Sequence, residues 1–385
     1  MPLAILFPRS DEATVDRRYA SWQSELLLHR AGGSVELVPY DSGEHMSEVA
    51  NWLDQERCLV ITDPFALVTR SSIEMLELAW ASGKGEAAVP VSNLASRAEL
   101  RPEGAESYIT IRQFEEMSAR IAASKSEPRI VEWADDDPGL FLTSREVLTA
   151  IRTAARHALR GKRVVVASGA LVHRWADMRD AKHLALVEHV PNDAHTILDL
   201  DCGEGLLGEA IKKRQKCRVI GIEHEQAAAA HARKRLDDVY YGDVSEIVAI
   251  IDQRFDMVVG GDILGYREDP WSFLIDLRRV MSEGGRLLLS VPNAANWAII
   301  ADLFHGRLDY NCDGITTAAY LRSFTRQSIT DALAIAGWDI VSIEPQAPIV
   351  NREYETMIAA LRAAGIEHSA DELAAPGYYV TARIR

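Results

Sequence analysis

The sequence predicts an α/β protein built from two domains. Short apolar runs alternate with helical stretches twice along the chain, which is typical of mostly parallel sheets covered by helices on both faces. The chain has 385 residues, more than a single hydrophobic core usually organises. A basic stretch at 160–163 makes a plausible junction, so we expect domains at 1–160 and 161–385.

The predicted elements of the first domain are apolar runs bounded by turn residues, with helical patterns between them. Strands are expected at 3–7, 35–40, 58–63, 87–92 and 130–133. Helices are expected at 108–124 and 145–159, and an acidic turn at 135–139 follows the strand at 130–133.

The second domain begins with a helical segment at 178–189 and then repeats the alternation. Seven strands are expected, at 196–200, 218–223, 238–242, 255–263, 285–291, 338–344 and 378–384. Further helices are expected at 326–336 and 351–364. The segment 292–324 is a long insertion, whose length suggests a lid or a loop that contacts substrate.

Composition excludes several classes of protein. The formal net charge of −15 would repel a phosphate backbone, so nucleic acid is not an expected partner. The apolar opening at 3–7 is too short for a signal sequence or a membrane span, and we expect a cytoplasmic protein without a membrane span. The cysteines are scattered without a CxxC pair, so neither a metal site nor a disulfide framework is indicated; they are Cys58, Cys202, Cys217 and Cys312.

A glycine-bearing turn is the sharpest local signal. Residues 197–205 read ILDLDCGEG, which is a buried strand ending in a carboxylate, then a turn, and then a helical pattern. Glycine lets the backbone approach a ligand closely, and the N-terminus of the following helix offers unpaired N–H groups. This pattern predicts a cofactor site.

Two kinds of cofactor fit the glycine spacing. Gly203, Gly205 and Gly208 spell GxGxxG, and Glu223 lies 223 − 203 = 20 residues later, as a dinucleotide fingerprint requires. An acid at that place can hold the ribose of a nicotinamide dinucleotide or of S-adenosylmethionine. Asp199 favours the second cofactor, because a pyrophosphate at the turn rarely tolerates a carboxylate beside it.

From roughly residue 170 to 385 the chain resembles the class I S-adenosylmethionine-dependent methyltransferases. Their first motif is an acid before alternate glycines, as at Asp199, Gly203 and Gly205. The later landmarks stand in order at Glu223 after strand two, Gly242 and Asp243 after strand three, Asp262 after strand four and GGRLLLSVPN at strand five. The resemblance implies a seven-stranded Rossmann-like methyltransferase sheet preceded by a second α/β domain.

The resemblance also implies roles for the acids. Glu223 would hold the ribose diol, Asp243 would meet the adenine amino group, and Asp199 would orient the methionine end of S-adenosylmethionine. The expected cofactor-binding residues are Asp199, Asp201, Cys202, Gly203, Gly205, Glu223, His224, Gly242, Asp243 and Asp262.

The chain departs from the family pattern in the glycine turn and on the acceptor side. Asp201 replaces the first glycine, where its side chain would crowd the methionine carboxylate and add a like charge. Two candidate acid–base pairs are absent, and no catalytic residue is assigned. Methyl transfer mainly needs in-line positioning, so a missing base does not exclude activity. The remaining candidates near the acceptor are Asn293, Asn296, His305, Asp309, Tyr310 and Asp313.

Two segments are similar in sequence to methyltransferases associated with bacterial glycosyltransferases. They read IGIEHEQAAAAHARKRLDDVYYGDV and NCDGITTAAYLRSFT. This resemblance implies methyl transfer to an oxygen or nitrogen of a small sugar-related or glycan acceptor. The first domain loosely resembles an A-type glycosyltransferase, with Asp63 at a strand end and a carboxylate cluster at 135–137. Two alternatives stay open, a non-catalytic binding or scaffold protein and a nicotinamide-dependent oxidoreductase, as does assembly into a homo-oligomer.

Overall fold

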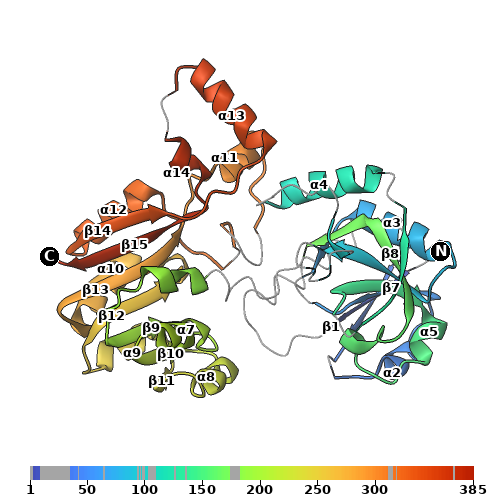
Figure 1. The fold of residues 1–385 in the computed structure, drawn as a ribbon, viewed down its shortest axis with the longest axis horizontal. Coiled ribbons are helices and arrows are strands. Elements are labelled where there is room, and N and C mark those ends of the chain that lie inside the picture. Colours follow the sequence, from blue (N-terminus) through green and yellow to red (C-terminus); the bar gives the residue numbers. More distant parts are fainter. Residues whose placement is uncertain are drawn as a thin grey trace. The chain divides into compact units, whose positions relative to one another are not determined.

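The computed structural model divides the chain into two compact units, Met1–Ala176 and Asp177–Arg385, each with its own sheet (Figure 1). The structure describes residues 3–8, 35–41, 43–63, 66–92, 95, 97, 100–102, 110–124, 127–134, 137–173, 183–310, 315–317, 319–366 and 369–385. The expected boundary near residue 160 is wrong, because β8 (Arg163–His173) hydrogen-bonds to β5 in the first sheet. The break therefore follows β8.

The first unit is an eight-stranded mixed sheet in the order β2-β1-β3-β7-β5-β8-β4, with β6 paired to β8. Beyond β8, its strands are β1 (Leu3–Pro8), β2 (Val35–Tyr40), β3 (Arg57–Ile61), β4 (Leu67–Val68), β5 (Ala87–Ser92), β6 (Arg129–Glu132) and β7 (Leu140–Ser144). The expectation of a mostly parallel sheet is wrong here, because β7 enters antiparallel to both of its neighbours and β4 and β6 pair antiparallel with β8.

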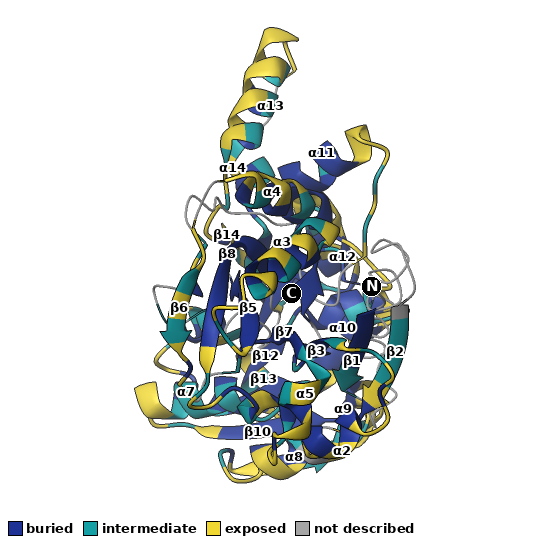
Figure 2. Cartoon of the chain, turned by 90° about the vertical axis from the view of Figure 1, so that its right-hand side faces the viewer, coloured by how far each residue is buried: buried dark blue, intermediate teal, exposed yellow. Residues whose placement is uncertain are grey.

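Helices cover both faces of the first sheet. They are α2 (Met46–Ala50), α3 (Arg70–Ala81), α4 (Ile111–Ala123), α5 (Arg145–Thr149) and the 3-10 turn η2 (Ala155–His157). Apolar residues of α2, α4 and α5 join one core cluster and those of α3 join the other. Figure 2 shows the mostly buried strands β5 and β8 with α3 and α4 beside them, exposed on their outer sides.

The helix expected at 145–159 ends at Thr149. The carbonyls of Ile151 and Thr153 accept hydrogen bonds from the first N–H groups of α2, at Ser47 and Met46. These acceptors satisfy N–H groups that have no partner within their own helix. The chain therefore leaves the helical path to hold α2 in place.

The second unit is a seven-stranded sheet in the order β11-β10-β9-β12-β13-β15-β14, and all seven predicted strands are confirmed. They are β9 (Thr196–Leu200), β10 (Arg218–Glu223), β11 (Asp238–Tyr241), β12 (Phe255–Gly261), β13 (Met281–Pro292), β14 (Trp338–Pro345) and β15 (Gly377–Ile384). The first five are parallel, and the chain reverses its direction of winding between β9 and β12. Ligands of open α/β sheets bind at such a switch point, outside the carboxyl ends of the strands.

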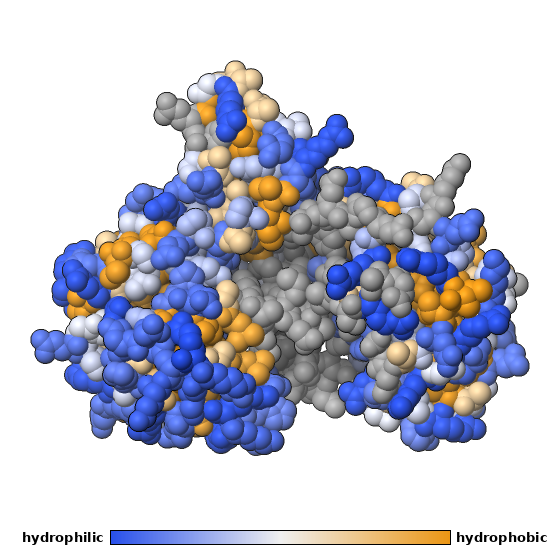
Figure 3. Space-filling view, viewed as in Figure 1, coloured by the Kyte–Doolittle hydropathy of each residue, from blue (hydrophilic) through white to orange (hydrophobic). Residues whose placement is uncertain are grey.

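Helices again cover both faces of this sheet. They are α7 (Leu206–Arg214), α8 (Gln226–Ala232), α9 (Val244–Ile250), α10 (Pro270–Leu277), α11 (Trp297–Phe304), α12 (Arg326–Ile335), α13 (Arg352–Ala363) and α14 (Ala370–Ala374), with 3-10 turns η3 (Ala185–His189), η4 (Ile263–Tyr266) and η5 (Arg278–Val280). Side chains of α7, α8 and η3 fill one core, and those of α9, α10 and α12 fill the other. Hydrophilic side chains dominate the surface at the lower left of Figure 3, where Figure 1 draws α7, α8 and α9.

The insertion at 292–324 contains α11, which the sequence did not predict. Asn293 and Asn296 are fully buried at its start, and their side-chain amides donate hydrogen bonds to the carbonyl of Ala375. These two asparagines therefore anchor the insertion, and the structure does not present them to an acceptor. Among the helices that the structure describes, none combines the length and apolar character needed to cross a membrane.

Candidate functional site

The turn between β9 and α7 keeps the backbone shape of a glycine turn although residue 201 is aspartate. Asp201, Gly203 and Gly205 all have positive φ angles, of 56°, 55° and 81°. Aspartate and asparagine are enriched among the non-glycine residues that adopt this left-handed conformation. The Cys202 N–H donates to the carbonyl of Ile222 at 3.0 Å, which ties the turn to β10. The turn is formed, and Asp201 is compatible with its backbone.

The glycines of the turn have different tasks. A Cβ added at Gly203 would meet no atom within 4 Å, so this glycine borders open space. A Cβ at Gly205 would lie 3.1 Å from the Ala232 backbone, and one at Gly208 would lie 2.5 Å from Leu236. Gly205 and Gly208 therefore permit close packing of α7, whereas Gly203 leaves room for a ligand against the backbone.

The side chain of Cys202 faces the core. A Cβ on Gly221 of β10 would lie 2.4 Å from the Cys202 Sγ, and burial raises the pKa of this thiol. The sequence placed Cys202 among the cofactor-binding residues; in the structure its side chain packs between the turn and β10. Any contact with a cofactor would have to come from its backbone.

Glu223 joins the end of β10 to the turn. Glu223 is 3% exposed, and its carboxylate accepts hydrogen bonds from the N–H of Gly203 and the N–H of Glu225, each at 2.7 Å. Burial, followed by the nearby charge of Asp201, raises its pKa, and the N–H of Glu225 opposes that rise. Glu223 thus holds the turn in shape with an anion that is poorly solvated.

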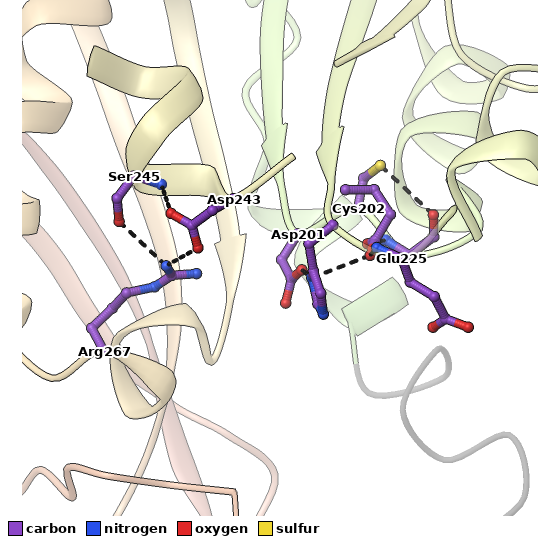
Figure 4. A network of polar contacts seen from close by, with 9 residues as sticks. Asp201, Cys202, Glu225, Asp243, Ser245 and Arg267 are labelled. Atoms are coloured by element: carbon purple, nitrogen blue, oxygen red, sulfur yellow. Dashed lines mark hydrogen bonds and ion pairs between the residues drawn. The ribbon is translucent and has the colours of Figure 1, made fainter. Parts of the chain in front are cut away.

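His224 links the two carboxylates beside the turn. Its Nδ1 lies 3.0 Å from Asp201 Oδ1 and 3.3 Å from Glu223 Oε1. Its side chain is 58% exposed, whereas those of Asp201 and Glu223 are 19% and 4% exposed. The pairing draws the Asp201 side chain toward His224; Figure 4 shows Asp201 in this network.

Asp199 is the most strongly perturbed acid of the site. It is 2% exposed, and burial raises its pKa to about 8, helped by the charges of Asp201 and Glu223 and opposed by the Gly208 N–H. Perturbed carboxyls of this kind gather at functional sites, because desolvation and like charge are arranged there together. Three carboxyl groups therefore meet at the switch point of the sheet.

Asp243 and Gly242 follow β11, as predicted, but Asp243 already has structural partners. Its Oδ1 accepts hydrogen bonds from the N–H groups of Ser245 and Glu246, so it is the N-cap of α9. Its Oδ2 lies 3.5 Å from the guanidinium of Arg267, a residue that the sequence did not point to (Figure 4). The Asp243 side chain remains 51% exposed and accessible to a ligand.

Asp262 anchors the insertion to the sheet. It is buried in a left-handed conformation with φ of 53°, and it accepts hydrogen bonds from the Ser290 hydroxyl at 2.6 Å and the Tyr320 hydroxyl at 2.9 Å. The Tyr320 ring lies over Gly265 and edge-on to Tyr266, with centroids 5.0 Å apart. The sequence placed Asp262 with the cofactor; in the structure its carboxylate accepts from Ser290 of β13 and Tyr320 of the insertion.

His183 lies beside the carboxyl end of β12, and the sequence did not single it out. A Cβ on Gly261, the last residue of β12, would stand 2.5 Å from the His183 Nε2. Glycine at 261 thus makes room for an imidazole at the carboxyl end of the strand. The only sequence signal was a histidine within a helical segment, which has no fixed spacing from the glycine motif.

The described candidates that the sequence offered within the insertion have partners of their own or lie exposed. His305 is 57% exposed and lies 3.9 Å from Glu353 of α13, and Asp309 forms an ion pair with Arg307. Tyr310 is half exposed. Asp313, like Cys312, lies outside the described residues.

Comparison with known proteins bears on the second unit. Residues 198–289 match the family described as "Methyltransferase domain". A probable S-adenosylmethionine-dependent methyltransferase of Mycolicibacterium smegmatis is 27% identical over 146 residues, which cover 37% of this chain and 52% of the relative. A ubiquinone biosynthesis O-methyltransferase of Pseudomonas paraeruginosa is 31% identical over 140 residues, which cover 32% of this chain and 60% of the relative.

The chain thus spans about half the length of the curated relatives it matches. Among solved structures, a SAM-dependent methyltransferase from Archaeoglobus fulgidus has 17% sequence identity, and the likeness covers 53% of this chain and 93% of that one with a TM-score of 0.39.

Proposed function

We propose, from the premise that the second unit carries a methyltransferase domain of the S-adenosylmethionine-dependent class, that the chain transfers a methyl group to an oxygen or nitrogen of a small acceptor. The observation that carries the proposal is the open space at Gly203, bordered by buried carboxyl groups at the switch point of the sheet. S-adenosylmethionine, the cofactor of this class, supplies a methyl group on a positively charged sulfonium. An anionic edge favours a cation of that kind.

The residues present fit this cofactor. Two backbone N–H groups use part of the hydrogen-bonding capacity of Glu223, and a carboxylate with about four acceptor positions retains room for ribose hydroxyls. The N-terminus of α7 offers N–H groups to a carboxylate, since its N-cap, Gly205, has no side chain to satisfy them. Asp243, half exposed, would meet the adenine.

On the acceptor side, Tyr320 and His183 are the groups that could position a nucleophile. Asp262 fixes the Tyr320 hydroxyl, and Gly261 leaves room for the His183 imidazole at the end of β12. An imidazole at this place could take the proton that an acceptor hydroxyl or amine loses. The insertion, fixed to the sheet edge through Asp262, would exclude water from the acceptor.

For the acceptor we propose a sugar-related molecule, because two segments of the chain are similar in sequence to methyltransferases that accompany glycosyltransferases. A second candidate is an aromatic hydroxyl, which the Tyr266 and Tyr320 ring pair and the ubiquinone biosynthesis relatives favour. Methylation of a panel of free sugars, sugar nucleotides and catechols with labelled cofactor distinguishes the two. Label only in the catechols would contradict the sugar proposal.

We also propose that the first unit is a degenerate glycosyltransferase-like domain. Supporting this, the buried Asp63 follows β3, and Asp137 accepts hydrogen bonds from the Thr62 hydroxyl and the Gly139 N–H. Acids from two segments thus approach the same strand end, as a diphosphate-bound cation would require. Pro64, Asp135 and Asp136 lie outside the described residues. Calorimetric titration with nucleotide sugars and Mn²⁺ tests the proposal, and no heat at millimolar ligand would contradict it.

Calorimetry with S-adenosylhomocysteine tests the methyltransferase proposal. We expect the wild type to bind, and Gly203→Ala to bind at least about tenfold more weakly, a loss of about 1.4 kcal/mol, because its Cβ enters the open space. Gly284→Ala is the matched control. Gly284 also has a positive φ with no atom within 4 Å of an added Cβ, so both variants carry similar backbone strain. Absence of wild-type binding at millimolar ligand would end the proposal.

The scaffold alternative predicts a different response to Asp201→Gly. If the site has decayed through Asp201, restoring glycine should raise affinity for S-adenosylhomocysteine about tenfold or more. Because the backbone at 201 already has the required conformation, we expect a change of less than about threefold. Retained binding also argues against the nicotinamide alternative, which predicts binding of NADH instead.

A further inference from the structure

The carboxylates beside the glycine turn form, with His224, a group of ligand atoms suited to a metal ion. One atom each from Asp201, Glu223 and His224 lies within 4.8 Å of the others. These three residues are called the Asp201 triad below. The turn and β10 bring them together, since Asp201 follows β9, Glu223 ends β10 and His224 follows it.

The two distances from His224 match those between ligands that share an ion. His224 Nδ1 lies 3.0 Å from Asp201 Oδ1 and 3.3 Å from Glu223 Oε1. For bonds of about 2.1 Å, neighbouring ligands are about 3.0 Å apart in an octahedral site and about 3.4 Å apart in a tetrahedral one. His224 Nδ1 therefore stands at ligand spacing from both carboxylates, and all three ligand atoms lie within 4.8 Å of one another.

A single hydrogen bond from His224 Nδ1 cannot serve both carboxylates well. A single imidazole nitrogen carries at most one hydrogen, yet Nδ1 faces two carboxylate oxygens. Its proton can point well at only one of them. A cation coordinated by all three atoms would satisfy both carboxylates at once, and would offset the like charges that also surround the buried Asp199.

The surroundings of the triad resemble those of a prepared site. The N–H groups of Gly203 and Glu225 orient the Glu223 carboxylate, as partners behind a ligand commonly do. His224 is 58% exposed and Asp201 is partly exposed, so an ion has a path from solvent and room for water ligands.

We propose that the Asp201 triad binds a first-row divalent transition ion such as Mn²⁺, Co²⁺ or Zn²⁺, and that this ion competes with the cofactor for Glu223. One imidazole with two carboxylates suits these ions, whereas Ca²⁺ takes six to eight oxygen ligands. Competition rests on the proposed function, because it follows only if Glu223 holds the ribose. Aspartate in place of glycine at position 201 then supplies a metal ligand.

Co²⁺ titration of the untagged, metal-stripped full chain, followed by visible absorption and calorimetry, tests the site. We expect one ion per chain, and binding at least about tenfold weaker in His224→Ala and in Asp201→Asn. His231→Ala is the matched control, because His231 Nδ1 also lies 3.0 Å from a carboxylate, that of Glu204, and is half exposed. No stoichiometric binding, or His224→Ala binding like the wild type, would overturn the proposal.

The competition is measured as affinity for S-adenosylhomocysteine with and without saturating Zn²⁺. We expect Zn²⁺ to weaken binding at least about tenfold in the wild type but not in His224→Ala. Unchanged or tighter binding would overturn the competition. The two proposals fail separately: loss of S-adenosylhomocysteine binding by the metal-free chain ends the proposed function, while absence of Co²⁺ binding with that affinity intact ends only the metal site.

Discussion

At the scale of single residues, the site is defined by acids that are close to one another and poorly solvated. Asp199 and Glu223 are both less than 4% exposed, and each has its pKa raised by burial first and by Asp201 next. Such a cluster reduces the stability of the folded chain whenever its members are charged. A positively charged ligand would recover part of that stability.

The free energy needed to charge these buried carboxyl groups should appear in the pH dependence of stability. The pKa of Asp199 rises from 3.8 to about 8, so between these values the folded state holds a proton that the unfolded chain has released. Stability from this group is therefore present below about pH 4 and is lost as the pH rises toward 8. We expect Asp199→Asn to be more stable than the wild type at pH 8, by on the order of 1 kcal/mol, with a smaller difference at pH 5.

Urea unfolding of the ligand-free chain at both pH values measures the effect. Asp252→Asn, which removes an exposed carboxylate after α9, is the control and should show no such pH-dependent gain. If Asp199→Asn instead lowers stability equally at the two pH values, burial does not raise the pKa of Asp199 and the prediction is wrong.

At the scale of elements, the insertion is fixed to the sheet through a few polar contacts. Asp262 after β12 accepts a hydrogen bond from the Tyr320 hydroxyl, and the carbonyl of Gly265 accepts from the N–H groups of Leu321 and Arg322. At the other end, Asn293 pairs with Phe324 and donates to the carbonyl of Ala375. The ends of the insertion are held, and its middle carries exposed apolar side chains.

Tyr320→Phe should loosen this attachment. It removes one donor from the buried Asp262 carboxylate, which costs about 1–3 kcal/mol locally. Hydrogen exchange measured by mass spectrometry should then become faster in residues 315–325, with α7 and β9 unchanged. Tyr310→Phe, at a half-exposed tyrosine of the same insertion, serves as the control. Equal protection in the two variants would mean that the Tyr320 hydroxyl does not hold the insertion.

At the scale of the whole chain, two units with separate cores share one polypeptide. Each sheet has its own pair of apolar clusters, and residues of one unit do not appear in the clusters of the other among the described residues. Units of this size with their own cores generally fold independently. The proposed cofactor site lies entirely in the second unit.

The fragment 177–385 should therefore fold and bind S-adenosylhomocysteine with a dissociation constant within about twofold of the full chain. Circular dichroism and calorimetry on the purified fragment check this. A folded fragment that no longer binds would show that the first unit contributes to the site, and an unfolded one would show that the units are not independent.

The sequence determined the local features of this protein. All seven strands of the second sheet and the glycine turn follow from apolar runs and glycine spacing, which depend on neighbouring residues. Elements that depend on distant partners were missed: β8 is a strand because it pairs with β5, and α5 stops at Thr149 because the following carbonyls hold α2.

Only the tertiary structure decided which predicted residues face one another. The sequence named Asp201, Glu223 and His224 but not their convergence, and it could not show that Cys202 turns into the core or that Asp262 holds Tyr320. Turn shape is set within a few residues, whereas contacts between side chains require strands distant in sequence to be brought into register. The glycine turn could therefore be predicted from the chain alone, and the charge environment around it could not.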